Sequence, residues 1–317
     1  MKKAQLGSAG PEIAVVGYGA WEAGGGVWGD APEDRTIQAI RAAADAGSDW
    51  VDTAEIYGRG RSEELVGRAL GNRSDIMIFT KVAPRGGGSG FRPEEVRGAA
   101  RASLRRLGRD VIDLYQLHWR DDSIPVEETW GAMAALVDDG LVRWIGVSNF
   151  DRALIERCER ERHVDSLQPQ FSLLHRDGRD DLLTFCDENG TGIICYGPLA
   201  YGLLTGAIDE TTEFAPDDWR GGSTGISYYR DLFAPGRFER NLAIVKELRP
   251  IAARLGIGVA QLSLAWVFHQ PGVTGAIAGS RSPAHVVENA AAGDVALSDA
   301  DLEEIDAVLK DAAPLEG

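Results

Sequence analysis

Four ionisable side chains stand at or just beyond the ends of short apolar runs, and they are Asp52, Tyr57, Lys81 and His118. A phenol has a pKa of about 10, which is too high for easy proton exchange near neutral pH. A nearby ammonium favours the phenolate and lowers that pKa, and a carboxylate would keep the ammonium charged and in place. An imidazole could orient a carbonyl oxygen beside them. Together these residue types predict delivery of a proton to a carbonyl oxygen.

Each residue also has an ordinary structural explanation. Asp52 could cap a helix and Tyr57 could be a packed aromatic residue. Lys81 could reach the surface from the end of a strand, with its apolar stem buried, and His118 could be a structural histidine. The joint structural explanation is weaker, because lysine and aspartate are rarely buried unless they are paired.

Reduction of a carbonyl also needs a source of electrons. The sequence has no HExxH motif and no clustered His or Cys spacing that would indicate a metal. A hydride donor, and therefore a nucleotide cofactor, is implied. The segment Gly24–Gly29, GGGVWG, formally matches GxGxxG, but its first glycine comes well after the preceding strand ends, whereas a dinucleotide fingerprint begins at the turn that leaves the strand. RGGGSG at 85–90 fits neither that motif nor the phosphate-binding loop.

The elements that must position these groups alternate along the whole chain. Short apolar strands are separated by amphipathic segments such as 31–47 and 92–110, which have helical spacing. Asn149 or Asp151 could cap the helix that follows the fifth strand. The predicted strands are Ile13–Gly17, Asp49–Asp52, Ile76–Lys81, Ile112–His118, Val142–Gly146, Asp165–Gln168, Gly192–Tyr196 and Gly275–Ala278.

Eight strand–helix units in this length predict a single α/β domain over residues 1–317, a (β/α)8 TIM barrel. Active sites of such barrels lie at the carboxyl ends of the strands, where the four ionisable residues are expected. A long irregular segment after the seventh strand, about 207–236, indicates a lid or binding loop. An extra helix near the C-terminus, in 298–313, could pack across the barrel.

Composition excludes several classes of partner. The chain has 317 residues, is 44% hydrophobic and carries a net charge of -16, which argues against nucleic acid or an anionic membrane as a partner. No stretch approaches the roughly 20 apolar residues of a membrane span, and the N-terminus lacks a signal-peptide core. The odd set Cys158, Cys186 and Cys195 predicts reduced core thiols in a cytoplasmic protein. The sequence does not indicate an oligomeric state.

The chain resembles the aldo-keto reductase family over nearly its whole length. The segments that carry the resemblance are WVDTAEIYGRGRSEELVGRAL, IFTKV, DLYQLHW, RWIGVSNF, LQPQFSLL, YGPLAYGLLTG and IAGSRSPAHVVEN. They occur in family order, and they are most similar to bacterial members that also resemble potassium-channel β subunits. The resemblance makes Tyr57 the general acid, Lys81 and Asp52 its supporting pair, and His118 the residue that orients the carbonyl.

The resemblance also implies a site for NADP(H), with NAD(H) less favoured. Ser148, Asn149 and Gln168 would bind the nicotinamide carboxamide and Tyr196 would stack on its ring, although each could instead be a cap or barrel packing. Trp21 and Trp119 would line the pocket of a small carbonyl or alcohol substrate, with Trp219, Tyr228 and Tyr229 adding aromatic surface. The remaining cofactor residues implied are Gly197, Leu199, Gly202, Gly279, Ser280, Arg281, His285, Glu288 and Asn289.

Within that set, Ser280 and Arg281 would contact the 2′-phosphate of NADP, and Glu288 and Asn289 would meet the adenine. Ala278 replaces a proline common in the family, and His285 stands where glutamine or arginine is frequent, so the choice between NADP and NAD stays open. The implied activity is NADPH-dependent reduction of an aldehyde or ketone, possibly a sugar, and the reverse oxidation. The alternatives are a cofactor-binding sensor or partner subunit with slow turnover, and a structural barrel without cofactor.

Overall fold

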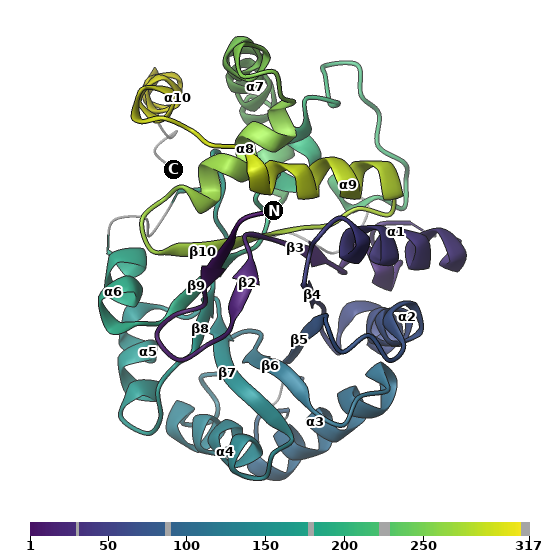
Figure 1. Cartoon of the computed structure of the whole chain (residues 1–317), viewed down its shortest axis with the longest axis vertical. Coiled ribbons are helices and arrows are strands. Elements are labelled where there is room, and N and C mark those ends of the chain that lie inside the picture. The colour runs from purple at the N-terminus through teal and green to yellow at the C-terminus, as the bar shows by residue number, and fades with distance from the viewer. Residues whose placement is uncertain (30–31, 86–89, 177–180, 222–228, 312–317) are drawn as a thin grey trace.

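Eight parallel strands close into a barrel at the centre of the molecule (Figure 1). The computed structural model describes residues 1–29, 32–85, 90–176, 181–221 and 229–311. Hydrogen-bonded neighbours follow chain order, and β10 closes the barrel between β9 and β3. The strands are β3 (Val16–Gly19), β4 (Trp50–Asp52), β5 (Met77–Val82), β6 (Ile112–Leu117), β7 (Val142–Ser148), β8 (Ser166–Gln168), β9 (Gly192–Cys195) and β10 (Val273–Ala278). The predicted (β/α)8 barrel is confirmed.

The first predicted strand, Ile13–Gly17, is wrong in its bounds. Residues Glu12–Ala14 form β2, which pairs with β1 (Lys3–Gln5) in an antiparallel hairpin, and the barrel strand begins only at Val16. Residues 13–16 are all apolar, so alternation could not reveal the boundary between two strands. The hairpin closes the amino end of the barrel, where Nε1 of Trp50 donates to the carbonyl of Ala14 at 2.8 Å.

Helices surround the barrel because their apolar faces pack on the outside of the strands. Asp151 caps α5 by accepting a bond from the backbone N–H of Leu154 at 2.9 Å, which decides between the two predicted caps. Asn149 instead adopts a left-handed conformation with φ of 61°. The helices that follow barrel strands are α1 (Glu33–Asp45), α2 (Arg61–Leu70), α3 (Pro93–Leu107), α4 (Val126–Asp138), α5 (Arg152–Glu159), α6 (Leu182–Asn189), α8 (Val259–Phe268) and α9 (Pro283–Ala291).

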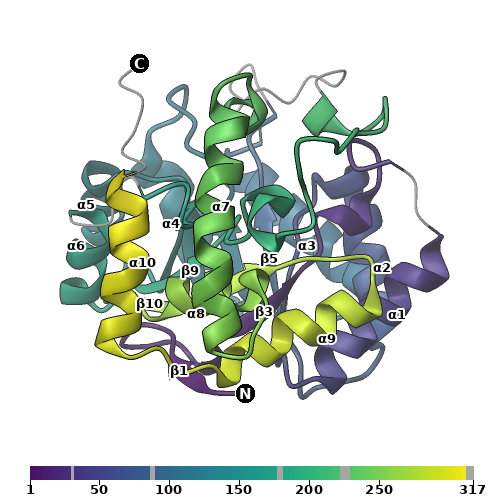
Figure 2. The ribbon, with the colours of Figure 1, turned by 90° about the horizontal axis from the view of Figure 1, so that it is seen from above.

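The predicted long segment after the seventh barrel strand is present. It carries short 3-10 turns at Ala200–Thr205 (η3), Trp219–Gly221 (η4) and Arg230–Phe233 (η5) before α7 (Arg237–Arg254) begins. The C-terminal helix α10 (Asp299–Asp311) lies alongside α7 rather than across the barrel (Figure 2). Its acidic residues explain this place, since Arg254 of α7 forms ion pairs with Asp301 at 2.9 Å and with Glu304 at 2.5 Å.

The three cysteines are free and buried, as predicted for core thiols. Burial raises the pKa of Cys158 and of Cys186 to about 12, so neither thiol forms an appreciable amount of reactive thiolate near neutral pH. They act as small apolar residues of the core.

None of the described helices is, taken alone, both long and apolar enough to cross a membrane. Helices α7 and α8 satisfy length and composition only when taken together, and they are bent by 89° relative to each other.

Candidate active site

The four predicted catalytic residues meet at the carboxyl end of the barrel. Asp52 is the last residue of β4, Lys81 lies near the end of β5, and His118 directly follows β6. Tyr57 begins the 3-10 turn η2 (Tyr57–Gly60) after β4. Because carboxyl ends of parallel strands share one face, residues from three strands come together there.

Asp52 and Lys81 form a buried ion pair in the barrel interior. Nζ of Lys81 contacts Oδ1 of Asp52 and donates to the carbonyl of Thr53 at 2.9 Å. The other oxygen, Oδ2, accepts a bond from Nε2 of Gln168 at 2.8 Å. Burial raises the pKa of Asp52 and lowers that of Lys81, and each charge opposes the shift of the other. Pairing therefore offsets part of the cost of holding these two charges away from water.

The turn that carries Tyr57 has a backbone that only certain residues tolerate. Gly58 has φ of 60° and Arg59 has φ of 57°. A Cβ on Gly58 would lie 2.3 Å from the carbonyl oxygen of Gly24, so glycine is required there for close approach of the two loops. The turn directs the phenol inwards, where Nζ of Lys81 lies 5.3 Å from the centroid of the Tyr57 ring.

The pKa of Tyr57 is raised, whereas the sequence predicted that the ammonium of Lys81 would lower it. Burial raises the pKa of its hydroxyl well above 10, and the carboxylate of Asp52 raises it further. Lys81 does not lower it here, because the lysine charge is matched by Asp52 at closer range. A phenol with a high pKa stays protonated, which suits a proton donor in the reduction direction.

His118 is held as a neutral imidazole facing Tyr57. Burial lowers its pKa well below 6.5, and the charge of Lys81 lowers it further. Its Nε2 lies 3.5 Å from the hydroxyl of Tyr57, and its ring stacks on Trp119 with 3.8 Å between centroids. Its Nδ1 is buried and has no hydrogen-bond partner within the described part of the chain.

A cavity of about 1040 Å³ opens above these residues. It contains both predicted substrate residues, Trp21 and Trp119, and every residue implied for the cofactor. The implied cofactor residues in its lining are Ser148, Asn149, Gln168, Tyr196, Gly197, Leu199, Gly202, Gly279, Ser280, Arg281, His285, Glu288 and Asn289.

The residues implied for the nicotinamide end are joined to one another. Oγ of Ser148 donates to the carbonyl of Gln168 at 2.8 Å, and the amide of Asn149 donates to Ser148 Oγ at 3.1 Å. The Tyr196 hydroxyl donates to Oδ1 of Asn149 at 2.8 Å. This donor and acceptor set fits a nicotinamide amide.

At the other end, Arg281 has partners that sequence reasoning did not foresee. Its guanidinium donates to the carbonyls of Trp28 and Gly29, each at 2.9 Å, and Nε lies 3.7 Å from Glu22. Arg281 therefore ties the loop that contains Gly24–Gly29 to the segment that follows β10. Glu22 and Arg220 also line the cavity. The sequence predicted neither Glu22 nor Arg220 as a residue of the site. Arg220 lies in the long loop after the seventh barrel strand, which is the one feature that could have indicated it, and no local pattern indicates Glu22.

The aromatic residues of the long loop divide between two places. Tyr229 lines the cavity, whereas Trp219 is completely buried behind it. Trp219 packs with Trp21 at 6.2 Å between ring centroids, so it supports the pocket wall instead of forming it. Tyr228 lies outside the described residues.

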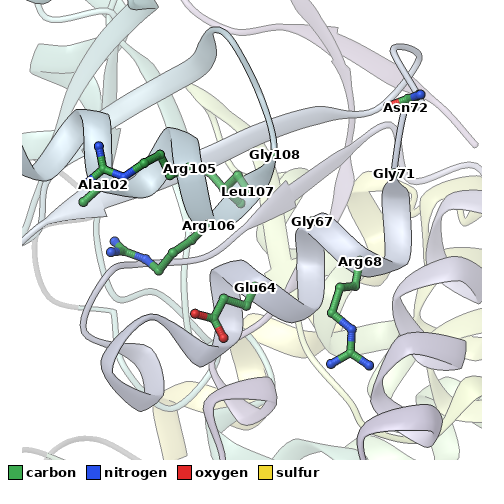
Figure 3. Close-up of a pocket in the computed structure, with 10 residues that line it drawn as sticks. All are labelled: Glu64, Gly67, Arg68, Gly71, Asn72, Ala102, Arg105, Arg106, Leu107 and Gly108. Carbon is green, nitrogen blue, oxygen red and sulfur yellow. The ribbon is translucent and has the colours of Figure 1, made fainter.

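A second groove lies on the outside of the barrel between α2 and α3 (Figure 3). Among the described residues, its lining shares nothing with the cavity above Tyr57. It is lined by Glu64, Gly67, Arg68, Gly71, Asn72, Ala102, Arg105, Arg106, Leu107 and Gly108.

The fold and the arrangement of the site agree with the comparison to known protein families. A family model described as "Aldo/keto reductase family" matches residues 15–310, and the chain belongs to this family. The protein is therefore an oxidoreductase that acts on small carbonyl compounds and their alcohols.

Two curated relatives and two solved structures give the similarity in detail. Aldo-keto reductase YhdN of Bacillus subtilis is 36% identical over 295 residues, covering 89% of this chain and 86% of that protein. The NADH-specific methylglyoxal reductase of Escherichia coli is 32% identical over 322 residues, covering 95% and 96%. Glycerol dehydrogenase AKR11B4 from Gluconobacter oxydans has a TM-score of 0.88 at 30% identity, covering 99% and 97%. An aldo/keto reductase from Klebsiella pneumoniae in complex with NADP and acetate has a TM-score of 0.75 at 32% identity, covering 96% of each chain.

Proposed function

We propose that this protein reduces an aldehyde or ketone with NADPH and catalyses the reverse oxidation, with Tyr57 as the general acid. The observation that carries the proposal is the approach of the Tyr57 hydroxyl to Nε2 of His118, 3.5 Å apart, in the lining of the cavity that also contains the implied cofactor residues. A carbonyl oxygen beside this pair, within hydrogen-bond distance of both atoms, meets a phenol and a neutral imidazole.

The chain's own residues have distinct roles in this proposal. When bound, the nicotinamide supplies the hydride. Tyr57 gives its proton to the carbonyl oxygen, and His118 orients that oxygen through Nε2. The buried Lys81 and Asp52 fix the electrostatic environment of the phenol. Trp21 and Trp119 exclude water from the reacting atoms, which strengthens these interactions.

The choice of cofactor rests on Arg281 and its surroundings. The solved Klebsiella relative holds NADP, whereas the Escherichia coli relative is named as specific for NADH. In this chain Arg281, Ser280 and His285 line the same end of the cavity, and a guanidinium can bind phosphate oxygens with two bonds. We infer a preference for NADPH, with Arg281 bonded both to the loop carbonyls and to the 2′-phosphate.

A substrate panel tests the proposal. Aldehydes, ketones and sugars are assayed with NADPH and with NADH, and the consumption of the reduced cofactor is followed. We expect turnover of uncharged carbonyl compounds and a higher kcat/KM with NADPH. Binding of NADPH without oxidation by any carbonyl compound would favour the sensor or partner-subunit alternative.

A further inference from the structure

A second ion pair lies outside the barrel wall, behind the strand that carries Lys81. Glu63 of α2 is completely buried. Its Oε2 accepts a bond from Nε of Arg106 on α3 at 2.6 Å and forms an ion pair with Nη2 of the same guanidinium, also at 2.6 Å. Arg106 reaches the surface at the groove of Figure 3. A charge is removed from water only at a large cost unless it is paired. This pair contacts neither the catalytic residues nor the cavity, so the proposed chemistry leaves it unexplained.

The carboxylate of Glu63 is connected to the strand of Lys81. Its other oxygen, Oε1, accepts a bond from the hydroxyl of Thr80 at 2.6 Å. Thr80 directly precedes Lys81 on β5, and successive side chains of a strand point to opposite faces. Glu63 therefore binds Thr80 on the outer face of β5. The next residue, Lys81, points to the inner face and pairs with Asp52.

The guanidinium of Arg106 is connected to the turn of Tyr57. Gly60 ends this turn with φ of 95°, and a Cβ placed on it would lie 2.6 Å from Cδ and 2.7 Å from Nε of Arg106. The Arg106 side chain thus packs directly on the last residue of the turn. It is held there by Glu63 and by Oγ of Ser103, which accepts from Nη2 at 3.2 Å.

We propose that Glu63 and Arg106 are positioning residues that keep Tyr57 and Lys81 in their mutual geometry. The pair acts through Thr80 on one side and Gly60 on the other, and it touches no substrate or cofactor. The inference rests on the proposed carbonyl reduction with Tyr57 as the acid. A displacement of reacting groups by about 1 Å can cost about a hundred-fold in rate. A small movement of the Glu63–Arg106 pair is therefore enough to lower the catalytic rate.

Adjacent residues of the same type provide matched controls. Glu63→Gln keeps an oxygen for Thr80 but removes the charge, and Glu64→Gln makes the same change one residue away, where the side chain is exposed. Arg106→Lys keeps a cation for Glu63 but loses the planar group on Gly60, and Arg105→Lys is its exposed control. For each variant kcat and KM with a simple aldehyde, the Kd for NADPH and the Tm are measured, with the assays run well below each Tm.

We expect Glu63→Gln and Arg106→Lys to lower kcat by about ten- to a hundred-fold. We expect KM and the Kd for NADPH to stay within about two-fold of the wild type, because the cavity itself is unchanged. The two control variants should match the wild type in every constant. A merely structural role would lower Tm without separating kcat from KM.

The outcomes distinguish this inference from the function on which it rests. An inactive wild type would overturn the proposed function and the inference with it. If the wild type and the controls are active and Glu63→Gln and Arg106→Lys are equally active, the inference is overturned while the proposed function stands. The same holds if KM and the Kd for NADPH rise in step with the fall in kcat. If Glu63→Gln does not fold, Arg106→Lys decides, because it retains the charge pair.

Discussion

The hydroxyl oxygen of Tyr57 lies 3.5 Å from Nε2 of His118, although the two residues are 61 positions apart in the chain. One side chain comes from the turn after β4 and the other from the end of β6, so only closure of the barrel brings them together. The burial that raises the pKa of the phenol also lowers that of the imidazole. Low local dielectric therefore leaves a protonated acid beside a neutral hydrogen-bonding partner.

Replacing Lys81 tests the electrostatic role of the buried pair. In Lys81→Met the carboxylate of Asp52 loses its counter-charge, and we expect kcat to fall by about a hundred-fold. Without Lys81 the carboxylate of Asp52, which already raises the pKa of Tyr57, is no longer matched by a cation. We therefore expect this pKa to rise further, so that the pH at which alcohol oxidation becomes fast moves upwards. The measurement is the pH profile of kcat in the oxidation direction. An unchanged rate and profile would rule out this role.

Asp52→Asn is the milder change at the same pair. The amide keeps the shape of the carboxylate and can still accept a bond from Lys81, so we expect a smaller loss of kcat than in Lys81→Met. Steady-state rates of the two variants, compared at one pH, give the order. A larger loss in Asp52→Asn would mean that the carboxylate does more than hold the lysine.

His118 makes stability depend on pH with a defined sign. Its pKa in the folded protein lies well below 6.5, whereas in the unfolded chain it is about 6.5. Below about pH 6.5 the unfolded state therefore binds an extra proton, and stability falls as the pH falls, by up to about 1.4 kcal/mol per pH unit. The free energy of unfolding by urea, measured at several pH values, should show a shallower slope in His118→Gln. Identical slopes in the two proteins would contradict a buried neutral imidazole.

Arg281→Ala tests the proposed preference for NADPH. Charge-assisted bonds contribute roughly 1.5–3 kcal/mol, so we expect the Kd for NADPH to rise by about ten- to a hundred-fold. NADH has no 2′-phosphate, and its Kd should change much less. Titrations of both cofactors followed by tryptophan fluorescence provide the comparison. Equal losses would mean that Arg281 serves only to hold the carbonyls of Trp28 and Gly29.

The reacting end of the site was predictable because each of its residues is marked locally. Asp52, Lys81 and His118 stand at the ends of apolar strands, and carboxyl ends of parallel strands share one face. Their convergence follows once the barrel is predicted. The sequence could not show whether the pKa of Tyr57 is raised or lowered, because the direction of this shift depends on how closely Asp52 approaches Lys81.

Other features depend on contacts between distant segments, which no local pattern records. The bonds from Arg281 to Trp28 and Gly29 span about 250 residues, and the burial of Trp219 depends on how its loop folds back. The hairpin β1–β2 was missed because its strands have three residues each, too few to show a period of two.

The central claim is that Tyr57 donates the proton, and a single-turnover experiment tests it most directly. Wild type and Tyr57→Phe are each saturated with NADPH and mixed with a simple aldehyde, and the oxidation of the bound cofactor is followed. Phenylalanine keeps the ring packed but removes the donor, so we predict an unchanged Kd for NADPH and a rate at least about a hundred-fold lower. Oxidation of NADPH by Tyr57→Phe at nearly the wild-type rate would contradict the account.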